Sequence, residues 1–272
     1  MIDGAVSAPA IRTLRGATAL LLTLGCLLAA LPGAAVATPT VSFKALPVPI
    51  SGFRHTGYIL GAGAALRAEY KIAGTEYGGF PPPLIGVNVY FPNGTKLHPK
   101  GFPTCARTVL EQVGPRGCPK GSAAGPVGHA NGVVAFGGER VEEGTTIEPF
   151  YAPGGGIEFF TIGHSPASLE IISSGHYVNV GGAGGFGLEF VGEIPLISTV
   201  PGAPYAVVES IQIKAGSARM EHGKPVYYGT IPARCATGGF PIKTELIFDE
   251  GGATPPVPET VTVSFKAPCP RK

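Results

Sequence analysis

The chain alternates apolar and polar residues with a period of two over many short segments. In LRAEYKI, residues 66–72, Leu, Ala, Tyr and Ile fall on one side and the charged residues on the other. Because successive side chains point to opposite faces of a strand, this pattern predicts strands with one buried and one solvated face. The same pattern predicts strands at 84–91, 186–190, 205–214, 242–248 and 260–267. In the segment 205–214, Glu209 falls on the apolar side.

One segment, CARTVLEQV at 105–113, has the period of a helix instead. Its apolar stripe is formed by Val109, Leu110 and Val113. Thr104 is placed to cap the start of the helix, and the Gly-Pro pair at 114–115 is expected to end it. We therefore expect a single short helix within a chain of strands.

Glycine and proline are expected to form the turns between the strands. The chain has 42 Gly and 28 Pro, yet it is 44% hydrophobic and only 14% charged, which is unlike a disordered segment. Asn93-Gly94, after a strand pattern, is a hairpin-turn signal. The predicted fold class is all-β, an antiparallel β-sandwich of which a jelly roll is one form, with one short disulfide-pinned helix.

The beginning and the end of the predicted β-region share a short sequence. VSFKALP at 41–47 returns as VSFKAPCP at 263–270. We interpret this repeat as two strands that lie in similar surroundings rather than as an internal duplication. It suggests that the first and last strands are of one type and lie next to each other.

Residues 1–37 are predicted to be a secretory signal peptide, and 38–272 a single β-sandwich domain. Arg12 and Arg15 precede an uncharged apolar run at 16–35, and Ala35-Val36-Ala37 fits a cleavage site. Two alternatives stay open: an uncleaved membrane anchor, and a lipoprotein with Cys26 as the lipidated residue. The predicted location is secreted, either extracellular or at the cell envelope.

The charge pattern limits the possible partners. The net charge is +2 with no basic block, whereas nucleic-acid binding needs a clustered basic footprint. No apolar run after residue 37 is long enough to span a membrane, so no span is expected once the signal peptide is cleaved. The partner is not readable from the sequence; a cell-wall or extracellular polymer is the class we keep.

The cysteines predict disulfides rather than a metal or redox site. Without Cys26 four remain, an even number in a chain with an export signal. Three pairings are possible. We favour Cys105–Cys118, because only 12 residues separate them, and Cys235–Cys269 by remainder. No Cys-x-x-Cys pair is present, so we expect no metal and no cofactor.

Three nucleotide- or hydrolase-like patterns fail on their context. Gly182-x-Gly184-x-x-Gly187 matches the dinucleotide fingerprint, but a strand pattern follows where a helix is required. His164 and Ser165 are adjacent in an extended segment, so their side chains point apart. Asp249, in a turn, is the only aspartate after residue 37. No catalytic residue is assigned.

A glycosidase would need two carboxylates across a cleft, and the sequence gives no means of pairing them. Glu209 is the most interesting, because burial would raise its pKa, although a slipped register would explain it equally. The candidates are Glu142, Glu143, Glu189, Glu193 and Glu209.

The cysteine motifs carry a resemblance to a known group. FPTCARTVLEQVGPRGCPKGSAAG, IPARCATGGFPIKTELIF and the terminal APCP resemble uncharacterised secreted proteins of actinobacteria with paired Cys and Cys-Pro motifs. The likeness covers about 102–128 and 230–270 and implies no activity. Ala236 follows Cys235 at a position where the group would have proline. This difference weakens the resemblance over 230–270.

Together these patterns predict an exported, disulfide-stabilised β-sandwich protein with a non-catalytic binding or structural role at the cell envelope. We lean against an enzyme, because no catalytic constellation is visible. The alternative is a carbohydrate-active enzyme or sugar-binding module on a sandwich scaffold, which predicts a groove lined by Tyr or Phe with two facing glutamates.

Overall fold

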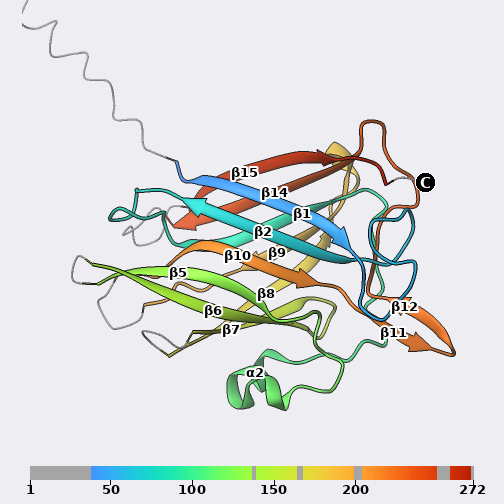
Figure 1. Ribbon diagram of the computed structural model, residues 1–272, viewed down its shortest axis with the longest axis horizontal. Coiled ribbons are helices and arrows are strands. Elements are labelled where there is room, and N and C mark those ends of the chain that lie inside the picture. The colour runs from blue at the N-terminus through green and yellow to red at the C-terminus, as the bar shows by residue number, and fades with distance from the viewer. Residues whose placement is uncertain (1–37, 137–138, 164–167, 199–203, 250–257, 271–272) are drawn as a thin grey trace, which may run out of the picture. The chain divides into compact units, whose positions relative to one another are not determined.

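The computed structural model describes residues 38–136, 139–163, 168–198, 204–249 and 258–270. The predicted signal peptide, with Cys26, lies outside them. Within these residues eleven strands form one antiparallel sheet in the order β1-β2-β10-β5-β6-β7-β8-β9-β3-β14-β15 (Figure 1). They are β1 (Thr40–Val48), β2 (Ala65–Ala73), β3 (Leu84–Pro92), β5 (Gly128–Phe136), β6 (Glu139–Tyr151), β7 (Ile157–Gly163), β8 (Leu169–Asn179), β9 (Phe186–Glu193), β10 (Val207–Ala215), β14 (Phe240–Asp249) and β15 (Pro258–Ala267).

Four shorter strands form two small pairs beside this sheet. β4 (Lys96–Leu97) pairs with β13 (Gly229–Thr230), and β11 (Ala218–Glu221) pairs with β12 (Lys224–Tyr227). The β11–β12 hairpin projects beyond the end of β10 (Figure 1). All pairings in the large sheet are antiparallel, so the predicted fold class is confirmed.

The sheet curls until its two edge strands, β1 and β15, contact each other. No ladder joins them; instead the rings of Phe43 and Phe265 pack with their centroids 5.9 Å apart. These two phenylalanines occupy the same place in the repeated sequence VSFKA. The prediction that the first and last strands are neighbours is thus confirmed. The sandwich is made of one nearly closed sheet, because the twist of antiparallel strands brings its edges together.

One half of the barrel-like sandwich has a filled core. Inward side chains of β1 and β2 meet those of β3, β14 and β15, and the apolar surface removed from water is the main stabilising term here. Tyr70 stacks on Phe43 at 4.7 Å, and its hydroxyl lies 3.5 Å from the Thr244 hydroxyl. The buried residues of this core include Phe43, Ala45, Tyr70, Ile72, Leu246 and Phe248.

The predicted helix is α2 (Arg107–Val113), and it covers the outer face of β6–β8 (Figure 1). Leu110 is completely buried against Phe150, Phe160 and Ile172. The expected cap at Thr104 is wrong, since the N-cap is Ala106 without a side-chain hydrogen bond.

The far end of α2 departs from the predicted stripe in one residue. Val113 is 62% exposed, because the helix ends there and its last side chain projects beyond the sheet. Gly114 ends the helix as expected, with φ of 71° and its N–H donating to the Leu110 carbonyl. Seven residues cannot form a stable helix in isolation, so Leu110 and the cysteine bridge hold it.

Both disulfides are present in the pairing that the spacing favours. Cys105 and Cys118 are bridged with their Cα atoms 5.1 Å apart, across α2. Cys235 and Cys269 are bridged at 5.9 Å and attach the segment after β15 to the loop before β14. Both distances lie in the normal range for disulfides.

Asn93-Gly94 forms a turn, but the strands on either side do not form a hairpin. Thr95 N–H donates to the Pro92 carbonyl at 3.1 Å, and Gly94 has a φ of 92°. β4, which follows the turn, pairs with β13 instead of returning along β3. The turn chemistry was therefore right and the inferred strand partner wrong.

Gly175 is expected to tolerate no side chain, because the ring of Phe190 covers it. A Cβ at position 175 would fall inside that ring, which also contacts Phe159 and Tyr177. We expect Gly175→Ala to lower the free energy of unfolding by about 1–3 kcal/mol, as overpacking does. Urea denaturation measures the change. The control is Gly144→Ala on β6, where a Cβ meets nothing within 4 Å; a loss as large as that of Gly175→Ala would contradict the assignment.

A candidate ligand-binding cavity

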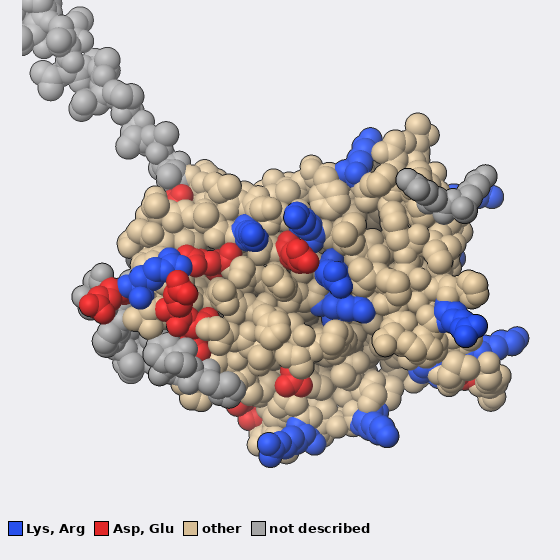
Figure 2. All heavy atoms as spheres, in the orientation of Figure 1, with Lys and Arg blue, Asp and Glu red and all other residues tan. Residues whose placement is uncertain are grey.

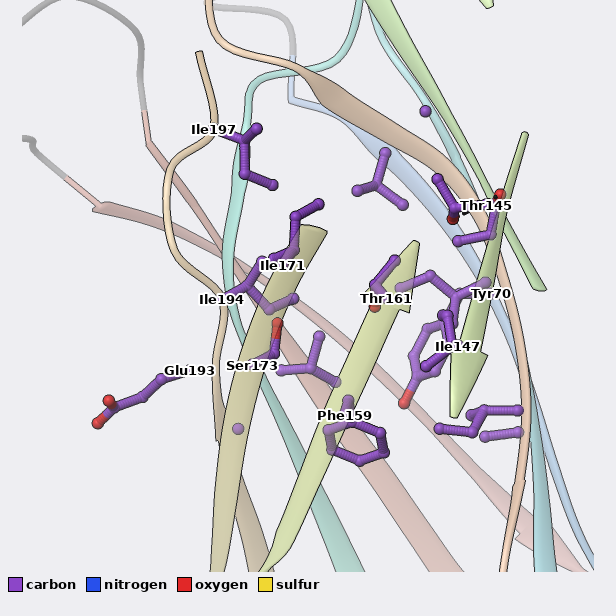
Figure 3. A pocket seen from close by; sticks show the side chains of 18 of the residues that line it. Tyr70, Thr145, Ile147, Phe159, Thr161, Ile171, Ser173, Glu193, Ile194 and Ile197 are labelled. Atoms are coloured by element: carbon purple, nitrogen blue, oxygen red, sulfur yellow. Dashed lines mark hydrogen bonds between the residues drawn. The ribbon is translucent and has the colours of Figure 1, made fainter. Parts of the chain in front are cut away.

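The other half of the barrel-like sandwich is hollow. Between β5–β10 and the filled core lies a cavity of about 480 Å³. Figure 3 shows side chains from several strands converging on it, among them Ile147, Phe159 and Ile171. The cavity exists because the inward residues of β5–β9 face one another across a gap wider than their side chains can fill. Its size lies within the roughly 300–1,000 Å³ of small-molecule sites.

The wall of the cavity is almost entirely apolar. Its polar members are few and neutral apart from two glutamates. Hydroxyls are carried by Tyr70, Thr145, Thr161, Ser173, Ser174 and Tyr177. Figure 3 shows Thr145 and Thr161 within the apolar wall. No Lys, Arg or His is among the described residues that line it. Such a wall suits a hydrocarbon ligand with a small polar group.

An aromatic cluster packs against Ile157, Phe159 and Tyr177 of the cavity wall; we call this end of the cavity the floor. Tyr151 stacks on Tyr228 with centroids 4.0 Å apart, and Phe102 packs edge-on against both rings. The Tyr151 hydroxyl lies 2.9 Å from the Ser217 hydroxyl, and Tyr228 donates to the Gly155 carbonyl at 2.7 Å. The floor is thus held by both ring packing and hydrogen bonds.

Burial keeps the floor tyrosines neutral. Desolvation raises the pKa of Tyr228 to about 12, and it also raises the pKa of Tyr151 and of Tyr177. The floor therefore contributes apolar ring surface and neutral hydroxyls at physiological pH. A smaller space of about 130 Å³ is lined in part by Tyr151 and Tyr228, and it shares Phe91, Ile157 and Tyr177 with the wall of the main cavity.

The opposite end of the cavity, which we call the rim, is lined by Val141, Leu169 and Ile197. Val141 lies near the start of β6, Leu169 begins β8, and Ile197 follows β9. Figure 3 shows Ile194 and Ile197 on the segment after β9, next to Ile171.

Glu143 is the buried carboxylate of the cavity wall. It is 3% exposed and shares the inward face of β6 with Thr145 and Ile147. Its carboxylate lies over Gly163 of β7, where a Cβ would collide with Oε1. Its cross-strand neighbour on β5 is Gly132, which likewise carries no side chain.

The other glutamates considered as catalytic candidates lie elsewhere. Glu193 is exposed, and Figure 3 shows its carboxylate directed away from the cavity. Glu142 is exposed and pairs with Arg140 at 3.1 Å. Glu189 is opposite Tyr90 in the β3–β9 register, on the outer face. Among these residues the structure brings Glu143 alone into the cavity as a buried group.

Glu209 is not buried among the apolar side chains of its strand. The β10–β5 register shifts between Val208 and Ser210, so Glu209 turns outward. There it forms a bidentate pair with Arg140, at 2.8 and 2.5 Å. The structure supports the slipped-register explanation. Glu209 is therefore not a buried carboxylate, and it is no longer a catalytic candidate.

The remaining sequence motifs do not form a site among the described residues. The glycines at 182–187 form a loop that leads directly into β9, as the strand pattern after them indicated. Asp249 ends β14 and is buried, and its N–H donates to the Pro83 carbonyl. His164 and Ser165 lie outside the described residues. No group of three or more His, Cys, Asp or Glu suited to a metal ion occurs in the described part of the chain.

The outer surface carries charges of both signs. Figure 2 shows Lys and Arg distributed singly or in small groups, with Asp and Glu among them and large uncharged areas between. On β2, Glu69 separates Arg67 from Lys71, and it is opposite Lys44 on β1. This face therefore has mixed rather than uniformly basic character.

Alternation in the sequence identified many of the inward residues but not the cavity. Val87 and Val89 of β3, and Ile211 and Ile213 of β10, were predicted to face inward, and they line it. The signal that could have pointed to a hollow is the excess of small inward residues, such as Ala130, Gly132 and Gly192. That signal becomes readable only when the strand order is known.

The fold and the cavity define an antiparallel, barrel-like β-sandwich with an apolar interior site. No family model matches the chain, and no curated protein or solved structure matches it either. Among the described residues no helix is long and apolar enough to cross a membrane.

Proposed function

We propose that this protein is an exported, non-catalytic binding protein of the cell envelope that holds an apolar ligand in its internal cavity. The observation that carries the proposal is the apolar cavity of about 480 Å³ between β5–β10 and the filled core. A single-chain lipid is the ligand class that such a wall fits best, since it offers hydrocarbon contact and few polar groups.

The energy of an unfilled cavity supports a binding role. Cavities in protein cores cost about 24 cal/mol per Å³. For about 480 Å³ the cost is on the order of 10 kcal/mol, comparable with the whole stability of a domain. Water does not offset this cost, because a water molecule needs several polar partners and the wall offers few. An apolar occupant would remove the cost.

Export is part of the proposal. The predicted signal peptide supports it, and two disulfides are compatible with an oxidising compartment. Kinship with the actinobacterial secreted group is also proposed, since both of its cysteine pairs are bridged in this chain. The described residues carry no feature that marks one envelope component as the partner.

Organic extraction of the purified, oxidised protein tests the proposal. We expect mass spectrometry of the extract to show a co-purifying single-chain lipid, and the delipidated protein to bind decanol with micromolar affinity or better. Bound ligand at 100 times its Kd should stabilise the protein by about 2.7 kcal/mol against urea. An empty extract together with no stabilisation by decanol, decylamine or decane would refute an apolar ligand.

The carbohydrate alternative predicts binding to sugars instead of decanol. The aromatic and acidic residues that such a site would use lie on the outer face. There Tyr90 donates to Glu245 at 2.9 Å, and Lys243 Nζ lies 3.6 Å from the Tyr90 ring centre. Because Lys243 already covers that face of the ring, a sugar would have to displace it. Binding on a glycan array, or hydrolysis of cell-wall polymers, with no response to decanol would favour this alternative.

A further inference from the structure

Building on the proposed function, we propose that the ligand is a neutral lipid with an acceptor oxygen inside its hydrocarbon chain, as in a fatty ester or a long-chain ketone, and that Tyr177 donates a hydrogen bond to this oxygen. The longer arm of the ligand fills the main cavity, and the shorter arm fills the smaller space next to it. The proposal thereby narrows the ligand from any single-chain lipid to one class of neutral lipid.

The first step of the argument is a ring of residues between the two spaces. Among the described residues, the main cavity of about 480 Å³ and the smaller space of about 130 Å³ share five lining residues. One comes from each of β2, β3, β7, β8 and β10: Leu66, Phe91, Ile157, Tyr177 and Ala215. We call these five residues the shared ring. Because its members come from five different strands, the ring marks the level of the barrel at which the two spaces meet.

The second step is the order of the lining residues along the strands. On β3, Val89 lines the main cavity, Phe91 lines both spaces, and Pro92 lines the smaller space. On the neighbouring β9, Phe190 lines the main cavity and Leu188 the smaller space. The two spaces therefore follow each other along the strands. A linear ligand that fills both of them has to lie within the shared ring.

The third step is the hydroxyl of Tyr177, the polar side chain of the shared ring. It makes no hydrogen bond with any residue in the described part of the chain. The floor tyrosines differ, because the Tyr151 hydroxyl lies 2.9 Å from the Ser217 hydroxyl and Tyr228 donates to the Gly155 carbonyl. A hydroxyl shielded from water without a partner loses the hydrogen bonds that it makes in the unfolded chain. An acceptor oxygen of the ligand at this level would restore one.

The fourth step is the kind of oxygen that Tyr177 can bind. Desolvation raises the pKa of Tyr177, so its hydroxyl is neutral and can donate at physiological pH. No Lys, Arg or His is among the described residues that line either space. An anionic group at the shared ring would lose its hydration without a cation to balance its charge. A neutral carbonyl or ether oxygen fits this position better.

The fifth step is the place of this oxygen within the ligand. On one side of the shared ring lies the apolar wall of the main cavity, with residues such as Val87 and Ile211. On the other side lies the smaller space, with residues such as Leu188 and Ile242. Since hydrocarbon fits on both sides, the oxygen lies inside the chain rather than at its end. Since the two volumes differ, the two arms of the ligand differ in length.

The test compares four neutral eleven-carbon probes on the delipidated, oxidised protein, below their solubility limits: undecane, 1-undecanol, 4-undecanone and 6-undecanone. Displacement of a neutral fluorescent probe gives each Kd. We expect 4-undecanone to bind roughly fivefold more tightly than undecane, which corresponds to one net hydrogen bond. It should also bind more tightly than 1-undecanol, whose oxygen is terminal.

The comparison of the two ketones tests the unequal arms. They contain the same atoms, but 6-undecanone has two arms of equal length. With its oxygen at Tyr177, it would place two more methylenes on the side of the smaller space than 4-undecanone does. If these two methylenes find no apolar contact there, the loss is roughly tenfold in Kd. We therefore expect 4-undecanone to bind more tightly than 6-undecanone.

Two variants locate the hydrogen bond. Tyr177→Phe keeps the ring and removes the hydroxyl, so the affinities for 4-undecanone and undecane should become equal within twofold. Without ligand this variant should unfold at an unchanged or higher urea concentration, because it loses no hydrogen bond within the protein. Tyr90→Phe is the matched control, since the Tyr90 hydroxyl lies on the outer face and donates to Glu245. It should leave the preference for 4-undecanone within twofold of the wild type.

The outcomes separate this inference from the proposed function. If none of the four probes binds, the proposed function itself fails. If undecane binds as tightly as 4-undecanone, the proposed function stands and the hydrogen bond from Tyr177 is wrong. Tightest binding of 1-undecanol or 6-undecanone would overturn the interior oxygen or the unequal arms. An unchanged preference in a folded Tyr177→Phe protein would overturn the role of Tyr177 and favour another hydroxyl of the wall, Thr161 or Ser173.

Discussion

Replacing Ala130 with phenylalanine is expected to weaken the binding of decanol about 100-fold. Ala130 lines the cavity from β5, between Thr145 of β6 and Ile211 of β10, so a phenylalanine ring there would occupy the space of a ligand chain. Displacing three to four methylenes costs roughly 0.8 kcal/mol each. Their sum, about 3 kcal/mol, corresponds to about two powers of ten in Kd.

The measurement is displacement of a neutral fluorescent probe from the delipidated protein. Asn131→Phe is the matched control, because the neighbouring residue is exposed and its new ring would stand outside the barrel. Ala130→Phe should unfold at an unchanged or higher urea concentration, since it fills a cavity. Equal decanol affinity in both variants would show that the ligand does not lie in this cavity.

Loss of the Cys235–Cys269 bridge is expected to lower the free energy of unfolding by about 3–4 kcal/mol. The bridge spans 34 residues, and closing a loop of that size in the unfolded chain accounts for an effect of this order. It also attaches the segment after β15 next to Tyr58, whose hydroxyl donates to the Pro268 carbonyl. Urea denaturation of Cys235→Ser/Cys269→Ser against the oxidised wild type measures the loss.

The other bridge provides the comparison. Cys105 and Cys118 have a sequence separation of 13, so the chain-entropy account gives a smaller loss, about 3 kcal/mol, for Cys105→Ser/Cys118→Ser. A loss below about 0.5 kcal/mol for the Cys235–Cys269 pair, or a reversed order of the two pairs, would contradict this account.

The elements were predictable where the signal was local. The alternation pattern predicted β2, β3, β14 and β15 almost to their ends, because a strand with one buried face has apolar residues at every second position. The helix and its end at Gly114 followed from equally local chemistry. The two disulfides followed from the number and spacing of the cysteines.

The errors occurred where a residue's surroundings come from distant parts of the chain. Glu209 is turned outward by a register shift against β5, and no feature of residues 205–214 announces that shift. Phe186 was expected to face inward, yet its ring packs 5.7 Å from Tyr90 on the outer face, again beside an irregularity in strand register. Register depends on both partners of a strand pair, so one strand's pattern cannot fix it.

The sequence by itself determined where β2, β3, β9, β10, β14 and β15 form, which face of these strands mostly avoids water, and which cysteines are available to pair, but it did not predict β5–β8. The tertiary structure alone decided that one sheet curls until β1 contacts β15, and that its inner faces meet in one half and stand apart in the other. The physical reason is that alternation reports only that a side chain leaves water. Whether it packs against another side chain or lines a cavity, as Ile171 does, depends on the order and curvature of strands far apart in the chain.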